Sequence, residues 1–156
     1  MPGAFMPFTY KIDTNLGLLY YWGFDVSMTE MLQVEKITST DPLRLPSMKI
    51  LIDLSDAELD VSMTDVYEAI KLNKGRLDMG RDLEATAIVS RSRFAKVIAE
   101  TYRLLLDDLP IQLGIFNTLP DAVKWLGLTD NVEEINEIKN EVMHSLKKNA
   151  GKGETE

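Results

Sequence analysis

The stretch KILIDLSDAELDVSMTDVYEAI, Lys49–Ile70, decides the fold because it holds a strand, a loop and a helix start in succession. Its first six residues, Lys49–Leu54, form a short apolar run, as expected for a strand buried on both faces of a sheet. An acidic loop follows, and a helical pattern then runs from Met63 to about Gly75. A buried strand that leads into a helix is the repeating unit of a parallel α/β sheet.

The segments on either side continue this alternation of strands and helices. Phe8–Ile12 and Leu18–Phe24 flank the turn sequence DTNLG and predict an opening β-hairpin. The other expected elements are a helix over 27–39, a strand over 83–90, a helix over 92–109, a strand over 111–116, a helix over 119–126 and a helix over 131–148. This order predicts an α/β fold with a mixed sheet of about five strands, mostly parallel beyond its first strand, built through right-handed crossovers.

Length and composition limit the classes of protein that this chain can represent. Its 156 residues suit one domain with a sizeable core, and the absence of cysteine removes disulfides, thiolate metal sites and cysteine nucleophiles. The longest uncharged run, Thr14–Phe24, is too short to span a bilayer, and the N-terminus lacks the pattern of a signal peptide, so we expect a cytoplasmic protein. A net charge of −8 argues against a general nucleic-acid binder, because phosphates would repel it.

The pentamer DVSMT occurs twice, at Asp25–Thr29 and at Asp60–Thr64, and each copy precedes a predicted helix. In each copy the serine is followed three residues later by an acid, Glu30 or Asp65, which is the capping-box pattern of a helix start. Thr118–Asp121 repeats the device before the short helix. The sequences around the two copies differ, so we interpret them as two similar helix caps and not as an internal duplication.

Few residues suggest catalysis or metal binding. The chain has one histidine, His144, near the end of the last predicted helix, and no cysteine. Without a histidine in the core, a Ser–His–Asp site is excluded. A zinc site is not expected, because two or more nitrogen or sulfur ligands are missing. Asp53 ends a buried strand, where phosphoaspartate proteins often place a catalytic aspartate, but we expect it to cap local backbone groups instead. Asp56, Glu58 and Asp60 cluster in the loop without the spacing of a calcium-binding loop. We therefore expect no enzymatic activity, no metal and no cofactor.

The last predicted helix has a narrow apolar stripe, formed by Val132, Ile135, Ile138, Val142 and Leu146, with Glu133, Glu134, Glu137, Lys139 and Glu141 placed elsewhere around it. Both faces of the predicted sheet are too apolar to be left in water, so one of them needs this helix as a cover. We predict that the stripe packs on its own sheet or on the partner in a homodimer. The expected organisation is a domain over 8–127, this helix over 128–148 and a flexible tail over 149–156.

Three phrases, KILIDLS, AIVSRSRFAKVIAETYRLL and IFNTLPDAVKWLG, carry a resemblance that runs from about Phe8 to Gly127. With the order of elements, they resemble the SpoIIAA-like branch of the STAS superfamily, named for sulfate transporters and anti-sigma factor antagonists. The resemblance implies a bacterial, cytoplasmic and non-enzymatic regulatory module with a protein partner. The alternative is a SEC14-like carrier of small apolar ligands, with a pocket lined by Met28, Met31, Met63, Tyr20 and Trp22, although such residues also suit a simple core.

The resemblance also marks a candidate regulatory site. In the antagonists, phosphorylation occurs at the start of the helix that follows the DLS strand end. On that alignment Ser62 takes the first hydroxyl position, Met63 the usual phosphoacceptor position and Thr64 the position of a glycine. A phosphate is electrostatically favoured near a helix N-terminus, although nearby aspartates oppose it. Ser62 and Thr64, with Asp53 beside them, are therefore the candidate phosphoacceptors or partner contacts, and a purely structural cap is the alternative.

Overall fold

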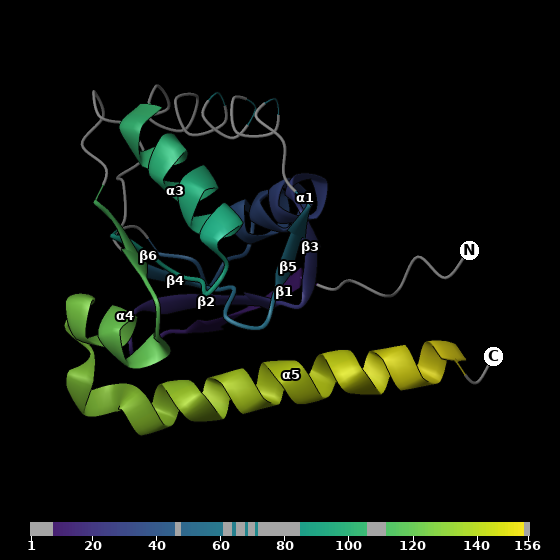
Figure 1. Cartoon of the computed structure of the whole chain (residues 1–156). Helices are drawn as coiled ribbons and strands as arrows, with labels where there is room; N and C mark the ends of the chain where they lie inside the picture. The colour runs from purple at the N-terminus through teal and green to yellow at the C-terminus, as the bar shows by residue number, and fades with distance from the viewer. Residues whose placement is uncertain are drawn as a thin grey trace.

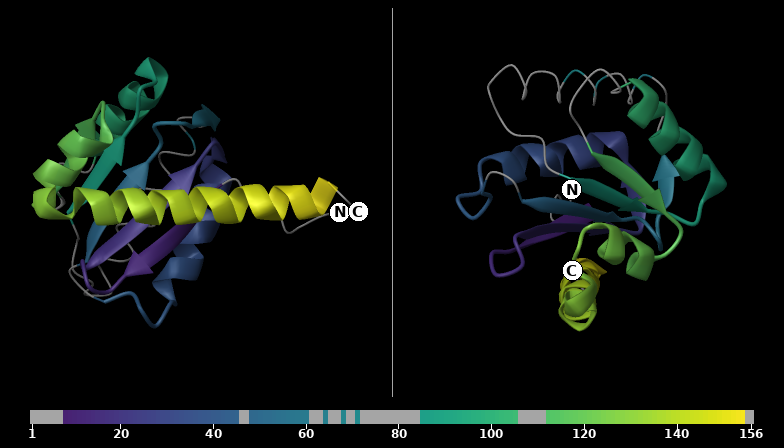
Figure 2. Two further views of the ribbon diagram at one scale, coloured as in Figure 1. Left: turned by 90° about the horizontal axis from the view of Figure 1, so that it is seen from below. Right: turned by 90° about the vertical axis from the view of Figure 1, so that its left-hand side faces the viewer.

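A computed structural model of the chain describes residues 8–45, 48–60, 64, 68, 71, 85–105 and 112–154. In these residues a five-stranded sheet lies between two layers of helices (Figure 1, Figure 2). The helices α1 (Met28–Ser39) and α3 (Arg93–Leu105) cover one face, and α4 (Leu119–Trp125) and α5 (Val132–Glu154) cover the other. A short 3-10 turn, Thr129–Asn131, joins α4 to α5.

The sheet has the strand order β1-β2-β4-β6-β7. Its strands are β1 (Phe8–Asp13), β2 (Leu18–Gly23), β4 (Lys49–Asp53), β6 (Thr86–Val89) and β7 (Leu113–Phe116). β1 pairs antiparallel with β2, and each later pair of neighbours is parallel. The opening hairpin, the parallel βα units and the five strands confirm the predicted α/β fold class.

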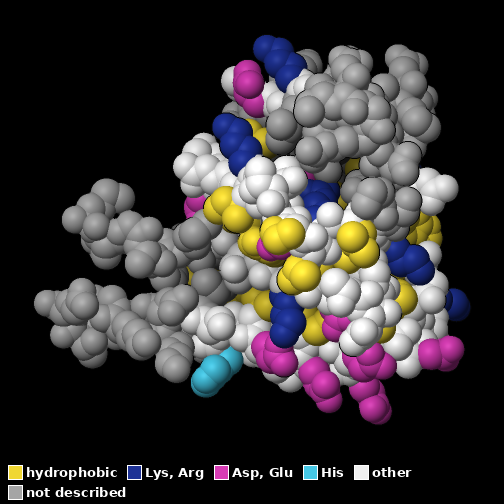
Figure 3. Space-filling view, turned by 180° about the vertical axis from the view of Figure 1, so that it is seen from behind, with side chains coloured by type: hydrophobic (Ala, Val, Ile, Leu, Met, Phe, Trp, Pro, Cys, Tyr) yellow, Lys and Arg dark blue, Asp and Glu magenta, His cyan; other side chains and the backbone are white. Residues whose placement is uncertain are grey.

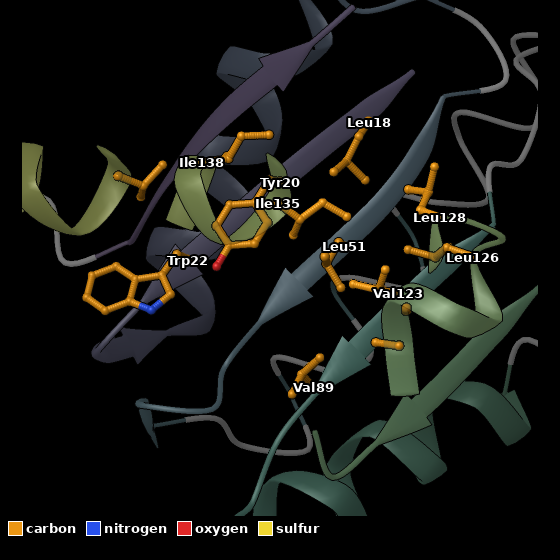
Figure 4. Packing of buried hydrophobic residues seen from close by; sticks show 13 residues of the cluster. Leu18, Tyr20, Trp22, Leu51, Val89, Val123, Leu126, Leu128, Ile135 and Ile138 are labelled. Carbon is orange, nitrogen blue, oxygen red and sulfur yellow. The ribbon is translucent and has the colours of Figure 1, made fainter. Parts of the chain in front are cut away.

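Strand β2 is buried at every position, because helices cover both of its faces. Its alternating side chains enter two separate cores. Leu18, Tyr20 and Trp22 join a cluster with residues of α4 and α5, which Figure 4 shows. Leu19 and Tyr21 point the other way, into a cluster that includes Val34 of α1. The run LLYYWG therefore packs against helices on both faces of the sheet.

A second, two-stranded sheet was not predicted. β3 (Asp25–Ser27) pairs in parallel with β5 (Glu58–Asp60), so that Ser27 stands opposite Asp60. This pairing places Ser27, in the first DVSMT copy, opposite Asp60, which is the first residue of the second copy. Strands of three residues carry too little alternation to be recognised in a sequence, and only the meeting of the two segments forms them.

Two predicted segments lie partly outside the described residues. α5 is helical as far as Glu154, and so includes 149–154 of the segment 149–156 that was expected to be a flexible tail. Each glycine in a helix costs about 1 kcal/mol relative to alanine, but the segment has no proline, so the helical hydrogen bonds can continue. Of the second predicted helix, only Thr64, Glu68 and Lys71 are described; all three are helical and exposed.

The predicted helix caps are present where the chain is described. Ser27 has an extended backbone, and its hydroxyl accepts a hydrogen bond from the Glu30 amide at 3.3 Å. The Glu30 carboxylate receives a hydrogen bond from the Ser27 hydroxyl at 3.1 Å, and not from the Ser27 amide as the capping box predicts. Thr118 caps α4 in the same way, accepting from the Asp121 amide at 3.3 Å. The cap of the second copy, at Ser62, lies outside the described residues.

Ser27→Ala should lower the free energy of unfolding by about 1 kcal/mol, because the first turn of α1 loses the acceptor for an amide. The change can be measured by urea denaturation followed by circular dichroism. Ser145→Ala, at an exposed position of α5, is the control and should differ from the parent by less than about 0.5 kcal/mol. An unchanged stability of the Ser27 variant would show that the cap does not stabilise α1.

Candidate functional site

A polar cluster lies inside the protein at the carboxyl end of β4. Asp53, the last residue of that strand, is fully buried. Its Oδ1 accepts hydrogen bonds from the Ser55 amide at 3.1 Å and from the Ser55 hydroxyl at 2.5 Å. Its Oδ2 accepts from the Tyr20 hydroxyl at 2.6 Å. Asp53 thus caps the backbone that follows its strand, as the sequence predicted.

Helix α5 supplies the cation of this cluster. The Nζ of Lys139 lies 3.2 Å from Asp53 Oδ2 and 3.4 Å from Asp56 Oδ2, and it donates to Ser55 Oγ at 3.3 Å. Asp56 Oδ2 also accepts from the Trp22 indole nitrogen at 3.3 Å. The Asp53–Lys139 cluster, made of Tyr20, Trp22, Asp53, Ser55, Asp56 and Lys139, therefore links β2, the loop after β4 and α5.

The surroundings of the Asp53–Lys139 cluster limit its chemistry. A buried carboxylate is tolerated only when paired and hydrogen-bonded, and Asp53 meets both conditions. Burial, with the charge of Asp53 as the next cause, raises the pKa of Tyr20 far above its usual value of 10, so its phenol stays protonated. Among the described residues no group of three His, Asp or Glu side chains could hold a metal ion. The cluster is built to hold helix α5 on the sheet.

A second polar cluster lies on the opposite face of the sheet, under α1. The Tyr21 hydroxyl donates to Glu35 Oε2 at 2.6 Å and lies 2.9 Å from Thr38 Oγ1. Arg44 Nη1 donates to Glu35 Oε1 at 3.0 Å and to Thr38 Oγ1 at 3.1 Å. Burial, followed by the charge of Glu35, raises the pKa of Tyr21. This cluster ties the end of α1 and the loop after it to β2.

The candidate phosphoacceptors and Asp53 differ in their exposure to solvent. Ser62 lies outside the described residues. Thr64 is helical and exposed, shortly after the end of β5. Asp53 is fully buried, and its carboxylate is bonded to Tyr20, Ser55 and Lys139, so it is not exposed to a partner in this structure. Of the candidate residues that the structure describes, Thr64 is the exposed one.

The three stripe residues of the last helix lie against the protein's own sheet. Ile135 is completely buried, and Ile138 and Val142 are nearly so. They belong to one cluster with Leu18, Tyr20 and Trp22 (Figure 4). The stripe therefore covers the lower face of the sheet in this structure.

Lys139 is the site residue that sequence reasoning misplaced. It was grouped with the glutamates outside the stripe, yet it lies on the buried side of α5 and contacts Asp53. A signal was present, because position 139 is four residues after Ile135 and three before Val142, which places it on the same side of the helix. A lysine on the buried side of a helix needs a buried anion, and Asp53 at the end of an apolar strand was the available one.

Comparisons with known proteins give one similar structure. No protein-family model matches the chain, and no curated protein matches it. The chain is similar to the crystal structure of an uncharacterized protein of the DUF3478 family from Shewanella loihica PV-4, described as having a SpoIIAA-like fold. The identity is 18% and the TM-score 0.46, with 70% of this chain and 83% of that one covered. The fold class stated above follows from the strand order and directions of this chain itself.

No helix in the described part of the chain has both the length and the apolar character that crossing a membrane requires.

Lys139→Met should lower the free energy of unfolding by about 3 kcal/mol, because it leaves the Asp53 carboxylate buried without its cation. Urea denaturation measures the change. Lys124→Met, on the exposed side of α4, is the matched control and should stay within about 0.5 kcal/mol of the parent. Equal effects of the two substitutions would contradict a stabilising role for Lys139.

Alkaline pH should destabilise the protein through its two buried tyrosines. The raised pKa values of Tyr20 and Tyr21 mean that the unfolded chain loses these protons above pH 10 while the folded chain keeps them. The free energy of unfolding should then fall as the pH rises, by about 1.4 kcal/mol per pH unit for each tyrosine. Urea unfolding at several pH values above 9 tests this, and Tyr20→Phe should make the fall less steep. Identical slopes for variant and parent would refute the prediction.

Proposed function

We propose that this protein is a non-enzymatic protein-interaction module of the STAS type that contacts its partner at the start of the second helix. The observation that carries the proposal is the exposed line of Thr64, Glu68 and Lys71. Their spacing of four and three residues places them on one side of the helix. The small sheet of β3 and β5 anchors the chain just before this line. An exposed helix side at an anchored position suits recognition by another protein.

The state of the buried charges supports binding over catalysis. A catalytic carboxylate must reach a substrate, whereas Asp53 is enclosed and bonded to Tyr20, Ser55 and Lys139. Glu35, on the other face, is engaged by Tyr21 and Arg44. The buried Asp53 and the partly buried Glu35 thus both connect helices to the sheet.

Thr64 is the position at which phosphorylation would regulate the contact. Thr64 is helical and exposed, and it lies four residues after Asp60, the last residue of β5. A phosphate adds a charge of roughly −1.5 to −2 and strong acceptor oxygens, so it would alter the electrostatics of the exposed line. Glu68 lies one turn further along and is paired with Lys71 at 3.8 Å. Its negative charge would repel a phosphate on Thr64, and the phosphate in turn would weaken binding to an acidic partner.

The packing around Tyr20 and Trp22 supports an interaction module over the alternative, a carrier of small apolar ligands. Both aromatic side chains are buried, and they share a cluster with Ile135 and Ile138 of α5. Each also donates a hydrogen bond to an aspartate, Asp53 or Asp56. A ligand on this face would have to displace α5 and break the Asp53–Lys139 cluster.

A photo-crosslinking residue at Thr64 or Glu68, in the chain expressed in its own cells, tests the contact. The two positions should trap the same partner protein. Thr29 is the matched control, since it has the same place in the first DVSMT copy and is also exposed. Equal crosslinking of that partner from position 29, or none from positions 64 and 68, would contradict the proposed surface.

Mass spectrometry of the intact protein purified from those cells tests the regulation. We expect a species that carries one phosphate, absent from Thr64→Ala and retained by Thr29→Ala. A phosphate retained in the Thr64 variant, or an unmodified parent under all growth conditions sampled, would rule out regulation at Thr64. Neither result would alter the crosslinking experiment.

A further inference from the structure

Strand β1 forms one edge of the main sheet, and among the described residues no strand pairs with its outer side. It pairs with β2 alone, over Phe8 to Asp13. Its outer side makes no backbone hydrogen bond to any other part of the described chain. Five of its six residues are only partly buried. An edge strand of this length is a template for a further strand unless something blocks it.

The side chains of β1 have different characters on the two faces of the sheet. Tyr10 and Ile12 pack on the α1 side, against the cluster that contains Val34. Lys11 lies on the α5 side, where it forms an ion pair with Glu141. Asp13 is two residues further and therefore shares the face of Lys11. The edge thus has an apolar side and a side with alternating charges.

We propose that β1 pairs with β1 of a second copy of this chain, in antiparallel orientation, to form a two-fold symmetric dimer with a continuous sheet. Two copies related by a two-fold axis perpendicular to the sheet keep their α1 sides together and their α5 sides together. Directly opposed residues must then point to the same face, so the axis passes midway between the two copies of one residue of β1, which we call the residue on the axis.

The charges on β1 select the register. With Lys11 on the axis, two ammonium groups would stand directly opposite each other, which is unfavourable. With Ile12 on the axis, Lys11 of each copy stands opposite Asp13 of the other, and the two isoleucines meet on the α1 side. The paired segment is then Lys11–Asp13 of each copy, because Tyr10 stands opposite Thr14, which follows the end of β1. The strand is therefore complementary to itself in charge and in apolar contact. Lys11 is paired with Glu141 of its own chain and gains a second carboxylate neighbour in this register. That neighbour is Asp13 of the other copy, whose Oδ1 also accepts a hydrogen bond from the Leu16 amide at 3.0 Å.

The surroundings of the edge also favour a second copy. The Tyr10 hydroxyl donates to Asp41 at 2.9 Å, which places the loop after α1 beside β1. Leu43 and Leu45 of that loop are each 53% exposed, and Ile37 at the end of α1 is 47% exposed. Figure 3 looks at this side of the molecule and shows hydrophobic side chains gathered in its middle, above a row of acidic side chains. Pairing at β1 brings the two apolar areas next to each other.

A single cysteine tests the axis directly, because the chain has no cysteine of its own. Ile12→Cys should form a reducible disulfide dimer under mild oxidation, since opposed residues on neighbouring strands bring their Cβ atoms to about 5 Å. Glu133→Cys, exposed on α5 away from β1, is the control and should crosslink much more slowly. Equal crosslinking rates for the two variants would overturn the proposal.

Charge reversal tests the register without a covalent link. The full-length parent should sediment as a dimer at micromolar to millimolar concentration. Lys11→Asp should weaken dimerisation by roughly tenfold, because two attractive cross-strand pairs become repulsive. The double variant Lys11→Asp with Asp13→Lys should recover the dimer, since opposite charges face each other again. Circular dichroism confirms that each variant is folded.

A parent that stays monomeric at the highest concentration, or a double variant as weak as the single one, would overturn the proposed pairing. The inference goes beyond the proposed function, and it uses a different surface. A failure of the β1 experiments leaves the contact at Thr64 as it stands, and a failure of crosslinking at Thr64 leaves the dimer as it stands.

Discussion

The ion pair between Lys139 and Asp53 is the contact on which the arrangement of α5 depends. Both charged groups are removed from most of the solvent, so each needs the other, and the pair can form only if α5 crosses the sheet at one place. That place puts Ile135 and Ile138 over Tyr20 and Trp22. Apolar contacts supply most of the stabilisation of this layer, and the polar contact determines its position.

The two neighbouring tyrosines of β2 extend this principle to both faces of the sheet. Tyr20 donates to Asp53 on the α5 side, and Tyr21 donates to Glu35 on the α1 side. Because successive residues of a strand point to opposite faces, one dipeptide contributes to both polar clusters. Asp53 and Glu35 thus both take part in contacts between the sheet and its helices. On the surface of the described chain, Thr64, Glu68 and Lys71 are exposed, and β1 stands at one edge of the sheet order.

Much of the fold could be predicted because its signals are local. The apolar run Lys49–Leu54, the hairpin turn before Leu18, and the serine and threonine caps each depend on residues close together in the sequence. The small sheet of β3 and β5 and the contact of Lys139 with Asp53 could not be predicted in the same way. Each joins segments that are far apart in the chain. These contacts form only when the fold brings the two segments together, so the sequence of either segment alone does not reveal them.

The amino-acid sequence by itself determined the alternation of strands and helices, the opening hairpin, the apolar stripe of the last helix and the absence of cysteine chemistry. Local periodicity and residue type are sufficient for these features. The tertiary structure alone decided that Asp53 is enclosed, that Lys139 belongs to the buried side of α5, and that β3 pairs with β5. It also decided that β1 is an edge strand, because the position of a strand in a sheet depends on which segments pair and not on the residues of that strand alone.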